Sequence, residues 1–297
     1  MGLISQSSRE RGFTLVEMIV VIVITGIIGG IVAVFIRAPV QGYVDSARRA
    51  EMSDIADTAL HRITRDLRLA LPNSVRVTSV ACGASTCSYL ELLPTGSPSC
   101  PANTVCLGGG RYRAGTGGGA GCAASPSGEE LDFTVADGCF GVLGTMPPFA
   151  AGDQVVVYNL GVAGADAYAG NNRTAWSSTA GSVVNITPKL FPFDSPNHRF
   201  HVISTPVTYV CNPVTGGGGT LTRYWGYAIQ AAQPSNTAAA PLSTASHALL
   251  ASNVSACSFT YDPLVSARNG LVTLNLGITE SGETVALYNA AHVSNTP

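Results

Sequence analysis

The chain has 297 residues, enough for one large domain or two small ones, and 11% of them are charged, against roughly 25% in typical soluble domains. The formal net charge is -2, and Lys189 is the single lysine among 16 basic residues. No polybasic stripe is therefore present to displace counterions from nucleic acid or to bind anionic lipid, and we expect no nucleic-acid partner.

The amino terminus combines a short polar leader, residues 1–12, with an apolar run over residues 13–36. A secretory signal would have an apolar stretch of roughly 7–15 residues, followed by an Ala-x-Ala-like cut site, and this run has neither property. Any cut should therefore lie before the run. Residues 18–36 carry no charge and, as a helix, would cover the roughly 30 Å hydrocarbon core of a bilayer. The sequence predicts one membrane-spanning helix over 13–36.

Glu17 lies inside this run, where a carboxylate costs on the order of 2.5–3.5 kcal/mol. No cationic side chain lies between Arg11 and Arg37, so the nearest complement is an amino terminus created by cleavage before Phe13. Within one rigid helix that amine points away from residue 17, and the amine of a neighbouring copy fits better. The alternative is that Glu17 extends to the lipid headgroups.

The segment 12–17, with the sequence GFTLVE, resembles the type IV prepilin processing site. The resemblance implies that Gly12 is the last leader residue and that Phe13 becomes the N-methylated first residue. It also implies that Glu17 pairs with the amine of an adjacent subunit during assembly. The implied partners are a prepilin peptidase/N-methyltransferase, other pilin subunits and the inner membrane. The alternative is an ordinary signal anchor.

A second helical pattern covers residues 37–71. Apolar residues recur every three or four positions and predict an amphipathic helix packed on a sheet. They are Met52, Ile55, Ala59, Ile63, Leu67 and Ala70. Pro39 suggests a kink or break before this part, and Pro72 should stop the helix. Gly26, Gly29 and Gly30 lower helix propensity within the span, where local melting is an option.

Residues 72–297 change character and predict a β-rich globular domain, which makes the fold class α+β with a long pilin-like helix on an antiparallel sheet. Strands are expected near 75–80, 89–93, 131–135, 154–160, 183–187, 200–204, 208–211, 220–229, 257–261, 271–278 and 283–288. The glycines at 216–219 predict a hairpin tip. The glycine-rich stretch 108–121 and the Ala/Ser/Thr/Pro-rich stretch 231–246 are expected to be loops that bury little apolar surface.

Eight cysteines all follow residue 80, without a Cys-x-x-Cys pair. An even number without metal spacing favours disulfides, which persist in an oxidising compartment and place the carboxyl-terminal bulk in the periplasm or at the cell surface. Eight cysteines allow 105 pairings. Spacing favours short loops and one strand-to-strand link. The expected pairs are Cys82–Cys87, Cys100–Cys106, Cys122–Cys139 and Cys211–Cys257.

Two further blocks narrow the resemblance: residues 65–74, RDLRLALPNS, and residues 199–211, RFHVISTPVTYVC. Both look like a minor pilin of the mannose-sensitive haemagglutinin (MSHA) pilus system. The end of the chain, from His292, is similar to the close of that family and of type II secretion minor pseudopilins. The resemblance implies a minor pilin that supports assembly or the tip of a type IV pilus, and a pseudopilin is the alternative.

Common catalytic signatures are absent from the sequence: no Gly-x-Ser-x-Gly, no His-Glu-x-x-His and no phosphate-binding Gly-Lys-Ser/Thr occurs. We therefore expect no enzyme, no cofactor and no metal. His198 and His201 lie three apart in a predicted strand and cannot form one metal site by themselves. A pilus-borne adhesin using variable loops and a membrane-anchored enzyme stay open as further alternatives.

Overall fold

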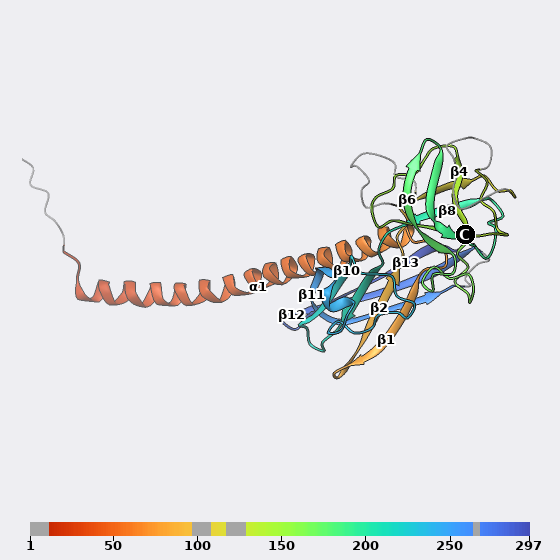
Figure 1. Cartoon of the computed structure of the whole chain (residues 1–297). Helices are drawn as coiled ribbons and strands as arrows, with labels where there is room; N and C mark the ends of the chain where they lie inside the picture. The colour runs from red at the N-terminus through yellow and green to blue at the C-terminus, as the bar shows by residue number, and fades with distance from the viewer. Residues whose placement is uncertain (1–11, 97–107, 117–128, 264–267) are drawn as a thin grey trace, which may run out of the picture. The chain divides into compact units, whose positions relative to one another are not determined.

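The computed structural model describes residues 12–96, 108–116, 129–263 and 268–297 (Figure 1). It divides into two compact units, with the boundary between Glu51 and Met52. Helix α1, Leu15–Arg68, runs through both. The helix is continuous across Pro39, which rules out a break there, and the alternative of a kink stays a prediction. A proline removes one N–H from the hydrogen-bond ladder, and long flanking stretches propagate the helix on both sides.

The last part of α1 packs on a β-sheet, as its apolar stripe predicted. Met52, Ala59, Ile63 and Leu67 are buried in the core that the helix and the sheet share. The helix ends at Arg68 rather than at residue 71. The cause is tertiary: the Leu71 N–H donates to the Leu93 carbonyl at 2.7 Å, which draws the chain out of the helix.

A seven-stranded sheet forms the body of the second unit, and every neighbouring pair in it is antiparallel. Its spatial order is β1-β2-β9-β10-β11-β12-β13. The strands are β1 Arg76–Cys82, β2 Ser85–Leu92, β9 Val207–Asn212, β10 Gly219–Trp225, β11 Ser246–Asp262, β12 Asn269–Glu280 and β13 Glu283–Ser294. The α+β class and the hairpin at 216–219, which joins β9 to β10, are confirmed.

A closed six-stranded barrel is inserted between β2 and β9 and stands apart from the sheet in Figure 1. Its order is β3-β4-β7-β6-β5-β8. The strands are β3 Gly109–Tyr112, β4 Asp137–Leu143, β5 Gln154–Val157, β6 Arg173–Ala180, β7 Val183–Lys189 and β8 Arg199–Ile203. Phe140, Phe200 and Val155 lie in its separate core. The sequence did not reveal this second module, and the strand expected at 131–135 is wrong, because β4 begins only at Asp137.

Strand β3 also corrects the interpretation of 108–121 as a loop throughout. A Cβ atom at Gly109 would lie 2.0 Å from the Phe200 carbonyl oxygen, and one at Gly110 would lie 2.9 Å from the Phe200 ring. Glycine is therefore needed for β3 to approach β8. At Gly109 and Gly110, glycine reflects close packing of two backbones rather than a flexible loop.

Polar contacts attach the barrel to the start of the sheet. The Asn73 side-chain amide donates to the Asn159 carbonyl at 2.9 Å, and the Asn159 amide donates to the Pro72 carbonyl at 2.7 Å. The Tyr168 hydroxyl donates to the Ser74 carbonyl at 2.9 Å. These buried groups satisfy one another, so the two β modules have a defined junction rather than a free linker.

Residues 226–245, here called the strap, cover β1 and β2. The Arg76 guanidinium donates to the carbonyls of Gln230 and Ala231 at 2.9 and 2.7 Å. Leu242, in the short helix η1 Leu242–Thr244, is buried together with Ala245. Most of residues 231–246 are exposed, so this stretch buries little apolar surface, as expected, and side-chain hydrogen bonds from the sheet hold it in place.

From the lowered pKa of His201, in β8, we expect the barrel to lose stability in mild acid. Burial, and secondly the nearby Arg199, lower this pKa from 6.5 to about 4. The folded state therefore binds the proton less tightly than the unfolded state. The contribution of His201 to the free energy of unfolding is fully present above pH 6.5 and is lost as the pH drops toward 4. Each unit of pKa difference between the folded and unfolded states corresponds to about 1.4 kcal/mol.

We expect His201→Gln to flatten this pH dependence, measured as the thermal midpoint of the full chain between pH 7 and pH 4. His198→Gln is the matched control, because His198 lies three residues earlier with a 41% exposed side chain. An equal effect of both substitutions would contradict the assignment to His201.

Candidate assembly site at the amino terminus

The start of α1 is fixed by Thr14, the residue before the first helical one. The Glu17 N–H donates to the Thr14 hydroxyl at 3.3 Å, and the Met18 N–H donates to the Thr14 carbonyl at 3.2 Å. Thr14 is thus the N-cap residue, with Glu17 three positions later. This Thr-x-x-Glu spacing is the signature of a capping box, a local signal that the sequence analysis did not use. The helix consequently begins directly after Thr14, at Leu15.

The Glu17 carboxylate makes no hydrogen bond or ion pair with any residue that the structure describes. A negative charge near a helix amino terminus is favoured by the helix dipole, by roughly 0.3–1 kcal/mol at exposed sites. That gain is smaller than the cost of placing a carboxylate in lipid, on the order of 2.5–3.5 kcal/mol. A countercharge from outside the described part of the chain would therefore stabilise Glu17.

The described residues of the first unit, 12–51, form no apolar core of their own. Their large apolar side chains are exposed on every side of the helix, and Phe13, next to the expected cut, is 79% exposed. A helix that is apolar all round must be covered by lipid or by other helices. Among the described residues α1 is the one helix long and apolar enough to cross a membrane. These features fit a membrane-anchored, single-pass protein with a carboxyl-terminal globular domain.

Gly26 and Gly30 lie one turn apart and border a shallow groove with Ile27, Val34 and neighbouring apolar side chains. No protein atom lies within 4 Å of a Cβ built at either glycine. Small residues spaced by four let a second helix approach closely within a membrane. The helix is intact through both glycines in this single chain.

Comparison with known protein families identifies a sequence signal in this amino-terminal segment. Residues 7–33 match the family model described as the prokaryotic N-terminal methylation motif. The chain carries a type IV pilin-type prepilin signal. The motif indicates a type IV pilin-like or pseudopilin precursor, and it implies processing by a prepilin peptidase and assembly with other pilins. No curated protein and no solved structure matches the chain.

The prepilin signal contains all three residues that the sequence singled out for processing and assembly. Gly12 and Phe13 precede the helix, and Glu17 lies in its first turn. A Cβ atom at Gly12 would meet nothing within 4 Å, so the fold of this chain does not require glycine there. Any such requirement must come from the processing enzyme.

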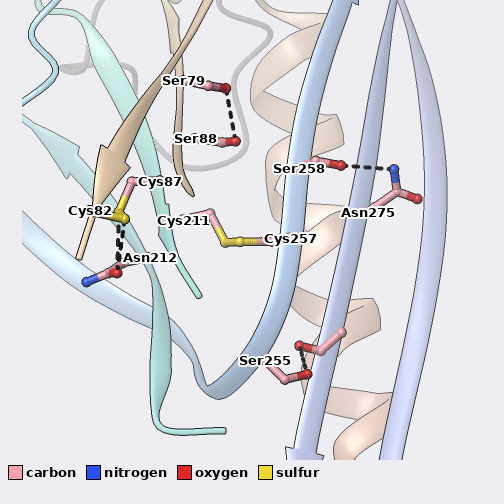
Figure 2. The surroundings of a disulfide bond; sticks show 11 residues. Ser79, Cys82, Cys87, Ser88, Cys211, Asn212, Ser255, Cys257, Ser258 and Asn275 are labelled. Atoms are coloured by element: carbon pink, nitrogen blue, oxygen red, sulfur yellow. Dashed lines mark hydrogen bonds between the residues drawn. A yellow bond between two sulfur atoms is a disulfide. The ribbon is translucent and has the colours of Figure 1, made fainter. Parts of the chain in front are cut away.

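Two disulfides of the second unit join cysteines that both lie in the described residues, and Figure 2 shows them. Cys82–Cys87 closes the β1–β2 hairpin with Cα atoms 5.7 Å apart. Cys211–Cys257 links β9 to β11, which are not neighbours in the sheet order, with Cα atoms 6.3 Å apart. These are two of the expected pairs. The link between β9 and β11 faces the core that α1 covers.

The other two expected pairs, Cys100–Cys106 and Cys122–Cys139, involve positions 100, 106 and 122, which lie outside the described residues. Cys139 is itself disulfide-bonded. Both pairings stay predictions. Across the described ranges, no group of three or more His, Cys, Asp and Glu side chains is placed to hold a metal ion.

Proposed function

We propose that this chain is a minor pilin, cleaved after Gly12, methylated at Phe13 and incorporated into an MSHA-like type IV pilus to support its assembly or tip. The observation that carries the proposal is the methylation motif at 7–33, on a helix whose apolar surface is exposed all round. Before assembly the helix would lie in the inner membrane and the disulfide-bearing domain in the periplasm. The role is structural rather than enzymatic.

The test is to isolate sheared surface filaments and to sequence the amino terminus of this subunit by mass spectrometry. We expect a chain that begins at N-methylated Phe13. Met1 retained in the filaments, or a mature chain confined to the membrane, would contradict the proposal. Neighbouring genes distinguish the two systems: MSHA assembly components favour the pilus, and secretion components favour a type II pseudopilin.

The inserted barrel favours a second candidate, a pilus-borne adhesin. Its core is separate from the core shared by α1 and the sheet, so a ligand-binding module could vary without disturbing assembly. Loss of surface binding with filaments intact, after substitutions on barrel loops, would support this candidate. Deleting all of 108–121 would be unsuitable, because it removes β3.

A further inference from the structure

The seven-stranded sheet has two edge strands, β1 and β13. The strap lies over the face of β1 and β2, where the Gln233 side-chain amide donates to the Arg76 and Tyr89 carbonyls at 3.4 and 3.1 Å, and Thr78 donates to the Gln233 amide oxygen at 2.7 Å. At the opposite edge, β12 is the one neighbour of β13 among the described residues. Uncovered edges are templates for pairing with another strand, and proteins usually block them.

The register of β13 shows which of its backbone groups point outward. Glu280 pairs with Glu283 across a two-residue turn, Ser281 and Gly282, in which both residues have positive φ. In such a hairpin the flanking residues form a hydrogen-bonded pair, and the pattern then alternates. Pairing continues without a register shift as far as Ser294. The even-numbered residues of β13 therefore direct their N–H and C=O groups away from β12.

The usual protections of an edge strand are missing from β13. Its sequence, ETVALYNAAHVS, contains no lysine, arginine or proline, and its pairing has no bulge. Tyr288, in the middle of the strand, is 66% exposed. Among the described residues, no hydrogen bond reaches an outward N–H between Thr284 and Ser294. A long edge without a bulge, whose one acidic residue is Glu283 at its start, is suited to strand addition.

A groove of about 740 Å³ runs between this edge and α1, and both Asn289 and Ala290 of β13 line it. On the helix side it is lined by Arg62, Arg65 and Arg68, and also by Asp57, which lies 3.6 Å from His61 in the same lining, so arginines outnumber carboxylates there. Arg62 lies 3.5 Å from Asp66, whereas Arg65 and Arg68 have no carboxylate partner among the described residues. Arg65 and Arg68 also interact favourably with the negative, carboxyl-terminal end of the helix dipole. That interaction leaves their exposed guanidinium groups available to bind an anionic group.

Asp66 does not neutralise the positive charge of the groove, because its carboxylate is hydrogen-bonded to side chains of the sheet. It is buried and accepts hydrogen bonds from the Tyr209 hydroxyl at 2.7 Å and from Arg223 at 2.9 Å. The hydroxyl of Thr64, which also lines the groove, is buried without a hydrogen-bond partner in the described structure. The groove thus offers positive charge and an unsatisfied polar atom beside the edge of β13, whose outward backbone groups are unpaired.

We propose that β13 is an assembly edge, which accepts an extended, acidic segment of another pilin subunit as an eighth strand of the sheet, with its carboxylates on Arg65 and Arg68. The inference rests on the proposed function, since it names the surface through which this subunit meets a neighbour. A second copy of this chain is disfavoured as the occupant, because it would bring its own arginines to the same groove.

The test places a photo-crosslinking residue, p-benzoylphenylalanine, at Tyr288 of the full chain in cells. The matched control carries it at Phe193, an exposed aromatic residue outside the sheet. We expect Tyr288, and not Phe193, to crosslink to a different pilin through a peptide that contains Asp or Glu. A crosslink to a second copy, or none from Tyr288 while the subunit is present in filaments, would overturn the inference.

Two variants then separate the backbone from the charges. Ala290→Pro removes an outward N–H and is tolerated at an edge, so it should lower the crosslink yield about tenfold, while Ala290→Ser should not. Arg65→Glu with Arg68→Glu should lower the yield similarly, and the double lysine variant should retain it. Unchanged yields in both disruptive variants would refute strand addition.

A failure of the inference about the β13 edge can be distinguished from a failure of the proposed function. If the subunit is absent from filaments, the proposed function fails, and crosslinking is then read in the membrane fraction. A crosslink there from Tyr288 to an acidic segment of another pilin supports the edge, and its absence overturns it.

Discussion

Gly12→Val should stop removal of the leader and leave the folding of the chain unchanged. A prepilin peptidase must bring its catalytic groups against the backbone at the cut, and glycine is the residue that leaves this backbone uncovered. Within the chain a side chain at position 12 would meet nothing within 4 Å, so the loss would arise in the enzyme rather than in this fold.

The measurement is the mobility and amino-terminal mass of the membrane-bound protein. We expect unprocessed chain to replace mature chain almost entirely, with an equal total amount. Gly2→Val is the matched control, since it makes the same change in the same leader away from the cut. Efficient processing of Gly12→Val would show that cleavage does not occur after Gly12.

Local sequence patterns were sufficient to predict the long helix α1. The apolar run to residue 36 and the stripe from Met52 to Leu67 each follow from helix periodicity, and the structure has both in α1. The end of the helix was placed three residues too late, because the bond from Leu71 to Leu93 is a tertiary contact. Composition alone could not indicate that contact.

The barrel was missed for a different reason. Gly109 and Gly110 in β3, and the polar residues of β6, lack the β-branched pattern on which strand prediction depends. Their strand structure is imposed by close approach to β8 and by closure of the barrel, which are long-range effects. The hydrogen bonds that hold the strap were likewise not predicted, since Arg76 comes from a distant part of the chain.

The candidate site was more accessible to sequence reasoning, because its residues are contiguous. Gly12, Phe13 and Glu17 lie within six consecutive residues, and a linear motif can therefore specify them. The β13 edge could not be found in this way. It depends on which strand is last in the sheet and on Arg65 and Arg68, far away in the sequence.

Glu17→Ala should reduce incorporation into filaments strongly and leave the membrane-bound protein unchanged or slightly increased. The substitution removes a carboxylate that makes no hydrogen bond or ion pair with the described residues, so folding of the chain does not depend on it. Removing it from lipid is favourable by on the order of 2.5–3.5 kcal/mol. In the filament, however, the methylated amine of a neighbouring Phe13 would lose its counter-ion in a low-dielectric bundle. One uncompensated buried charge costs about 3–5 kcal/mol, enough to exclude most of the subunit.

Glu51→Ala is the matched control for this experiment, because it removes an exposed carboxylate from the same helix outside the apolar run. Cells carrying each variant are fractionated, and the subunit is quantified in membranes and in sheared filaments. Wild-type amounts of Glu17→Ala in filaments would mean that Glu17 only extends to the headgroups. A fall in the membrane fraction would mean that it acts in insertion or folding, through the helix start at Thr14. A loss confined to the filaments is the result that assigns Glu17 to the contact between subunits.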